Sequence, residues 1–166
     1  MNQKTIAIVA IVIVAVAVIG VVAYWALTRP PSETPPTGIA DATSLKFNVD
    51  IIGGNANGTY RYMSKNIGTS DMMIRVEIPT PGVELVYIVN GAQQKAWSYE
   101  GAGWNDLSST FSTQWDAWES TYSGYTDRLT TWTSGDWTYT GDDGSSVRVY
   151  DITVNPTLDD SLFAPP

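Results

Sequence analysis

Residues 72–99 read MMIRVEIPTPGVELVYIVNGAQQKAWSY, and this stretch decides the expected fold. Apolar and polar side chains alternate over residues 72–78, which is typical of a strand with one buried face. Residues 79–82, PTPG, interrupt the alternation, and a second strand-like run then leads into Asn90-Gly91. Asn-Gly between two such runs is a strong hairpin signal, because both residues tolerate a positive φ angle. The stretch therefore predicts three consecutive antiparallel strands.

Similar alternation is found on both sides of this stretch. Leu45 to Ile51 form one alternating run, and Tyr60 and Tyr62 flank Arg61 in the next. Two later runs, DWTYT and SSVRVYDITV, surround the turn residues Gly-Asp-Asp-Gly at 141–144. Short turns between about seven predicted strands favour an antiparallel meander.

One segment has helical spacing instead. Its large apolar residues are separated by 4, 3, 4, 3, 4 and 3 positions, so they would share one face of a helix. They are Phe111, Trp115, Trp118, Tyr122, Tyr125, Leu129 and Trp132. Gly124 is expected to interrupt this run, so two short helices fit as well as one long helix. We therefore predict a mainly β (α+β) domain, in which a helical segment packs across the concave side of a curved antiparallel sheet.

The N-terminus predicts a membrane anchor. Residues 6–27 are apolar except for Gly20. A helix of this length spans about 33 Å, close to the hydrocarbon thickness of roughly 30 Å. Lys4 precedes the run, and Tyr24 and Trp25 lie at its outer end, so the positive-inside rule favours a domain outside the cell. Residues 1–28 are thus the predicted single-pass anchor. A cleavable signal peptide and a pilin-like polymerisation helix are the two alternatives.

The next segment predicts a spacer. Residues 29–37 read RPPSETPPT, and four prolines in nine residues favour polyproline II over helix or strand. We assign residues 29–43 to a Pro-rich linker and residues 44–166 to an extracytoplasmic β domain at the cell surface. Asn57-Gly58-Thr59 is an N-glycosylation sequon within a turn, so a glycan on Asn57 is expected there.

The amino-acid composition argues against several classes of function. The chain has 9 Lys and Arg against 17 Asp and Glu, which argues against nucleic acid as a partner. It has no His and no Cys, which excludes disulfides, Cys/His zinc sites and Ser-His-Asp triads. No set of nucleophile and base is visible either. We therefore predict no enzyme activity, no cofactor and no metal site.

The aromatic residues leave two interpretations open. They form a filled core, or they line a cavity between sheet and helix that accepts an acyl chain or another apolar molecule. The same residue types serve both purposes, so the sequence does not separate them. For the cavity, the predicted wall consists of Met73, Trp97, Trp115, Trp118 and Tyr122. Arg75 is predicted to hold an anionic headgroup at the mouth by a charge-assisted hydrogen bond.

The order of four motifs over roughly residues 44–166 resembles the outer-membrane lipoprotein carrier (LolA-like) family. The motifs are GTYRY at 58–62, MIRVE at 73–77, LVYIVNGAQQKAWSYE at 85–100 and LDDSLFAPP at 158–166. The resemblance implies an incomplete β-barrel with helices that plug a cavity for lipid or lipoprotein acyl chains. Arg75 matches the position of an Arg that carriers of this family use in handling their cargo. Those carriers are released, whereas this chain is expected to be tethered, which favours binding or sensing over shuttling.

Two functions are therefore expected. The first is a membrane-anchored extracytoplasmic domain that binds lipid or another apolar ligand non-covalently. The second is a structural role, as a cell-surface protein or pilin-like filament subunit with a β-rich head.

Overall fold

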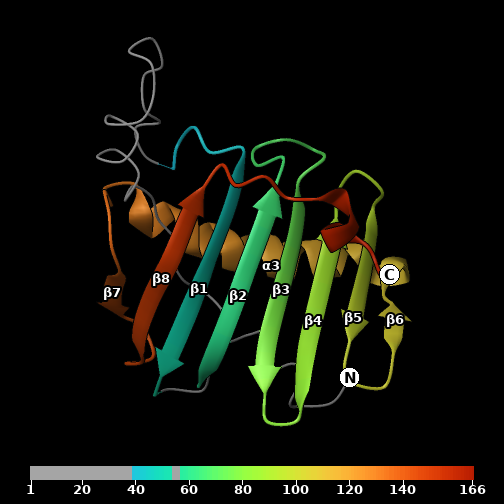
Figure 1. The fold of residues 1–166 in the computed structure, drawn as a ribbon, viewed down its shortest axis with the longest axis horizontal. Helices are drawn as coiled ribbons and strands as arrows, with labels where there is room; N and C mark the ends of the chain where they lie inside the picture. The colour runs from blue at the N-terminus through green and yellow to red at the C-terminus, as the bar shows by residue number, and fades with distance from the viewer. Residues whose placement is uncertain (1–38, 54–56) are drawn as a thin grey trace.

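The computed structural model describes residues 39–53 and 57–166. Within these residues, eight strands form one antiparallel sheet in the order β6-β5-β4-β3-β2-β1-β8-β7 (Figure 1). The strands are β1 Ser44–Ile52, β2 Gly58–Lys65, β3 Met73–Thr80, β4 Val83–Asn90, β5 Lys95–Tyr99, β6 Trp104–Asp106, β7 Trp137–Thr140 and β8 Ser146–Val154. The predicted class, mainly β with an antiparallel sheet and a helix packed on it, is confirmed.

The connection between the sheet's two edges is a helix. Strands β1 to β6 follow one another as a meander, and the chain then enters α3, Phe111–Thr126. Figure 1 shows α3 running behind the sheet from the side of β6 to the side of β7. After β7, strand β8 pairs with β1 and completes the sheet. The helix therefore covers one face of the sheet across its width.

The main core lies between this face and α3. Alternate residues of the strands point toward the helix, among them Phe47, Val49, Tyr62, Ile74 and Val76. The rings of Phe47 and Tyr62 stack with centroids 4.8 Å apart and planes 4° from parallel. Burial of these side chains from water is the main stabilising contribution.

The opposite face carries a second, smaller core. Its members are Met63, Val86, Ile88, Trp97 and Phe163, the last from the C-terminal segment. We call residues 155–166 the C-terminal strap. The strap explains why β4 is buried on both faces from Val86 to Asn90, and why its sequence is a continuous apolar run with no alternation.

Two details differ from the sequence-based expectation. Strand β6 was not predicted, because three residues are too few to show alternation. The helix is not interrupted at Gly124 but continues to Thr126, where a 3-10 turn, Asp127–Leu129, follows. Packing accounts for this continuity, since Tyr122 and Tyr125 on either side of Gly124 are buried against the sheet.

The predicted anchor, residues 1–28, and the linker up to residue 38 lie outside the described residues. In the part of the chain that the structure describes, no helix is both long and apolar enough to cross a membrane.

Candidate functional site

Three of the six predicted ligand-binding side chains lie on α3 and face the sheet. Trp118 is 2% exposed, and its ring lies 5.0 Å from that of Tyr87 on β4. Tyr122 is also buried, and its hydroxyl accepts a hydrogen bond of 2.9 Å from Ser64 Oγ on β2. Burial raises the pKa of Tyr122, so this hydroxyl stays protonated at neutral pH. Trp115, one turn nearer the start of the helix, is only partly buried.

The centre of the layer between α3 and the sheet is filled by aromatic rings. The ring of Tyr125 lies 5.0 Å from that of Tyr62 and 5.7 Å from that of Phe47, and all three side chains are completely buried. The hydroxyls of Tyr62 and Tyr125 make no regular hydrogen bond with the described residues. Burial raises the pKa of both well above its ordinary value. In this central region, the aromatic side chains therefore form a filled core.

An open groove is found at the margin of the same layer. It has a volume of about 330 Å³ and lies between α3 and the loop that joins β2 to β3. We call it the helix groove; its lining residues are Ile67, Gly68, Thr69, Met72, Trp115, Glu119, Tyr122, Ser123 and Thr126. The helix groove thus contains two of the predicted wall residues, Trp115 and Tyr122.

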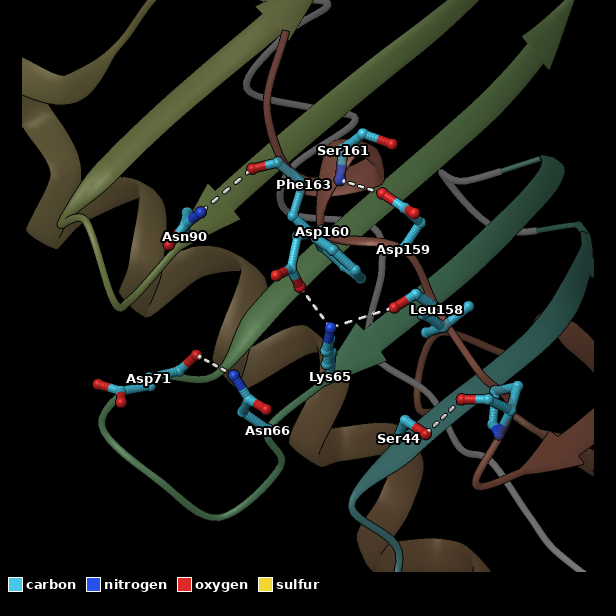
Figure 2. Close-up of polar contacts among 11 residues, drawn as sticks. Ser44, Lys65, Asn66, Asp71, Asn90, Leu158, Asp159, Asp160, Ser161 and Phe163 are labelled. Atoms are coloured by element: carbon cyan, nitrogen blue, oxygen red, sulfur yellow. Dashed lines mark hydrogen bonds and ion pairs between the residues drawn. The ribbon is translucent and has the colours of Figure 1, made fainter.

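Local hydrogen bonds fix the loop on one side of the helix groove. Asn66, at a φ of 57°, donates from Nδ2 to the carbonyl oxygen of Asp71 at 3.2 Å (Figure 2). Thr69 Oγ1 donates to the carbonyl oxygen of Asn66 at 2.8 Å. Gly91 lies against this loop, since a Cβ at that position would come within 2.7 Å of the Met72 carbonyl oxygen. The loop wall of the groove is therefore preformed.

The other three predicted residues lie on the opposite face of the sheet. Met73 and Trp97 belong to the apolar cluster beneath the C-terminal strap. Arg75 lies beside them, and its Nε donates to Glu77 Oε1 at 2.7 Å. A second nitrogen of Arg75, Nη1, donates to the carbonyl oxygen of Leu162 in the strap at 2.9 Å. The guanidinium is thus already paired, and it is separated from the helix groove by the sheet.

The strap is held to the sheet mainly through its own carbonyl groups. Figure 2 shows Lys65 Nζ donating to the carbonyl oxygen of Leu158 at 3.1 Å and pairing with the Asp160 carboxylate. Asn90 Nδ2 donates to the carbonyl oxygen of Phe163 at 3.2 Å. Phe163 itself is completely buried in the apolar cluster. The chain's own C-terminal strap thus occupies the place where Met73, Arg75 and Trp97 were expected to receive a ligand.

The six predicted residues therefore do not line one cavity. A strand alternates between two faces, and the sequence does not say which face the helix will cover. The sequence signal for the strap is the continuous apolar run at residues 85–89. A strand with such a run is buried on both faces and therefore requires a second covering element. Asn57 is exposed at the turn before β2, where its Oδ1 accepts a hydrogen bond from the Gly53 amide. Glycosylation there stays a prediction.

No metal centre is formed by residues 39–53 and 57–166, where no group of three His, Cys, Asp or Glu side chains could hold an ion. Comparison of the chain with protein-family models, with curated proteins and with solved structures gives no match.

Proposed function

We propose that this chain is a membrane-anchored, extracytoplasmic domain that binds a lipid or another apolar molecule non-covalently in the helix groove. The observation that carries the proposal is an open groove of about 330 Å³ whose wall includes Trp115, Tyr122, Met72 and Ile67. Concave sites with mostly apolar walls and a few polar groups are typical of small-molecule binding, and this volume is at the small end of their range. The sheet with a packed helix also agrees with the LolA-like resemblance, whose incomplete barrel is part of the proposal.

The size of the groove sets the strength of binding. An alkyl segment of about ten methylene groups would gain roughly 8 kcal/mol on leaving water. Association costs at least about 4 kcal/mol. The net affinity is then roughly millimolar. Such a ligand is bound only where it is concentrated, which suits a domain tethered beside a membrane.

The groove's charge favours neutral ligands. Glu119 is the charged residue among its lining side chains, and its Oε1 accepts a hydrogen bond of 2.5 Å from Ser123 Oγ. Arg75, which was expected to hold an anionic headgroup, lies on the other face of the sheet, where it pairs with Glu77 and the strap. A carboxylate at the rim repels an anionic headgroup. The proposed ligands are therefore neutral acyl lipids and not fatty acids.

A photo-crosslinking experiment tests this proposal. Full-length protein is irradiated with a monoacylglycerol that carries a diazirine in its acyl chain, and labelled peptides are mapped by mass spectrometry. Labelling is expected to saturate and to fall on the peptides that contain Met72 and Trp115. Trp115→Ala should lower it several-fold, whereas Trp104→Ala, which removes a partly buried Trp from β6 on the strap side, should not. Labelling that does not saturate, or that both variants lower equally, contradicts the proposal.

The packed centre supports a second candidate, a structural head. Phe47, Tyr62 and Tyr125 fill the space between α3 and the sheet, as they would in a rigid module without cargo. In that case the domain would decorate a cell surface or filament. Electron microscopy of native membranes distinguishes the two, since ordered filaments support the structural role and dispersed particles do not. Neither candidate includes catalysis, because the chain has no His or Cys and no visible nucleophile–base set.

A further inference from the structure

A second groove lies on the strap side of the sheet, away from the helix groove. It has a volume of about 430 Å³ and is formed by side chains of β1, β2, β3 and β8. The C-terminal strap crosses the sheet at one end of the strands (Figure 1). We call it the polar groove; its lining residues are Lys46, Asn48, Arg61, Met63, Glu77, Asp151 and Thr153.

A β-bulge in β8 adds a carboxylate to this groove. Val147 and Val149 face the main core before the bulge, and Ile152 and Val154 face it afterwards. The alternation of inward and outward side chains along β8 therefore shifts by one residue. The shift occurs at Asp151, which has a φ of 54°. Its Oδ2 accepts a hydrogen bond of 2.9 Å from Asn48 Nδ2. Bulges often redirect side chains beside binding sites, and a non-glycine residue in this conformation is strained.

The charges of the polar groove are balanced. Lys46 and Arg61 are positive, whereas Glu77 and Asp151 are negative. Arg61 is engaged, since its Nη1 lies 3.0 Å from Glu84 Oε1 and 4.0 Å from Glu77 Oε2. The side chain of Lys46 is exposed, and its ammonium makes no hydrogen bond or ion pair with the described residues. Equal numbers of cations and anions give no net attraction for an anionic or a cationic ligand, so the occupant is expected to carry no net charge.

The polar groove contains both hydrogen-bond donors and hydrogen-bond acceptors. The Lys46 ammonium donates, the Asp151 carboxylate accepts, and the amide of Asn48 and the hydroxyl of Thr153 do both. The hydroxyl groups of a sugar also donate and accept, and can bridge such a pair. Met63 provides an apolar floor against which the C–H face of a sugar ring can pack. We propose that the polar groove binds neutral saccharides through Lys46, Asn48, Asp151 and Thr153.

The proposal is tested on the full-length chain in a detergent without a sugar headgroup. Saturation-transfer NMR is recorded with maltose, cellobiose, lactose, mannobiose and chitobiose as probes. At least one is expected to bind, and Lys46→Ala should weaken it about tenfold, which is the loss of one charge-assisted hydrogen bond. Lys95→Ala, which removes another exposed lysine from β5, serves as the matched control and should leave binding unchanged.

Asp151 provides the sharper test, because its two roles respond differently to substitution. Asp151→Gly keeps the bulge, since glycine adopts positive φ without strain, but removes the carboxylate. The variant should fold normally and bind the probe about tenfold more weakly. Absence of binding by all five disaccharides overturns the proposal, as does equal binding by wild type, Lys46→Ala and Asp151→Gly. The monoacylglycerol labelling of the helix groove should not change in these variants, so the two proposals can fail separately.

Discussion

Replacing Phe163 by Ala tests whether the C-terminal strap is a stabilising part of the fold. The ring is completely buried among Met63, Val86, Ile88 and Trp97. Removing a buried phenylalanine side chain typically costs about 3–5 kcal/mol, because apolar contacts are lost and a cavity remains. The whole free energy of unfolding of a domain is about 5–15 kcal/mol. Phe163→Ala should therefore remove a large fraction of the stability or release the strap.

Two measurements separate these outcomes. Urea unfolding followed by tryptophan fluorescence gives the change in free energy, and amide hydrogen exchange over residues 156–166 reports release of the strap. If the strap detaches before the sheet unfolds, exchange accelerates there and the fluorescence of Trp97 shifts as its cover is lost. If the strap instead stays attached, the free energy of unfolding falls while the strap keeps its protection in the folded state.

Phe111→Ala is the matched control, because Phe111 lies at the start of α3 and is only partly buried. We expect a loss of roughly 1–2 kcal/mol from partial burial of its ring. Phe163→Ala could lower the free energy of unfolding no more than Phe111→Ala does, with hydrogen exchange over the strap unchanged. That result would show that Phe163 does not stabilise the fold by holding the strap to the sheet.

Two further predictions concern the tyrosines of the main core. Tyr122→Phe leaves the buried Ser64 Oγ without its acceptor and should cost about 1–3 kcal/mol in urea unfolding. Tyr62→Phe removes a hydroxyl that makes no regular hydrogen bond with the described residues, and should be neutral or stabilising; equal losses in the two variants would argue against this assignment. Burial raises the pKa of Tyr62, Tyr122 and Tyr125 in the folded state, so stability is retained below pH ~10 and falls as pH rises further. Phenolate absorbance should therefore rise together with unfolding, and early titration of all tyrosines in the folded protein would contradict the burial of these hydroxyls.

Much of the sheet could be predicted from alternation alone. Strand β3 obeys it, because one of its faces contacts the core and the other contacts solvent or the strap, whereas β4 is buried on both faces and does not alternate. The helical spacing from Phe111 to Tyr125 also corresponds to a real helix. Beyond Thr126 the spacing continues without an α-helix, through a 3-10 turn at Asp127–Leu129. Trp132 is still buried, with its Nε1 donating to the carbonyl oxygen of Gly135 at 2.9 Å, so burial need not imply regular structure.

The site was less predictable than the sheet. Sequence identified aromatic and methionine side chains as large and apolar, but the face on which each lies depends on where α3 and the strap pack. Val147, Val149, Ile152 and Val154 show that a change of phase within a strand is visible in the sequence once a bulge is considered. Arg75 alternates with the buried Ile74 and Val76, so the sequence places it on the opposite face of β3. That the strap covers this face has no local signal, because the pairing of Arg75 with Leu162 joins residues 87 positions apart.

The pairing of β1 with β8 also has a consequence for how the protein is made. Val49 pairs with Val149, one hundred positions later, and the Ser44 carbonyl oxygen accepts from the amide of Asn155. A ribosome delivers β1 long before it delivers this partner, so one side of that strand stays open during most of synthesis. Such distant pairings form slowly. In a nascent chain with this order of strands, the sheet closes only after residue 154 has emerged.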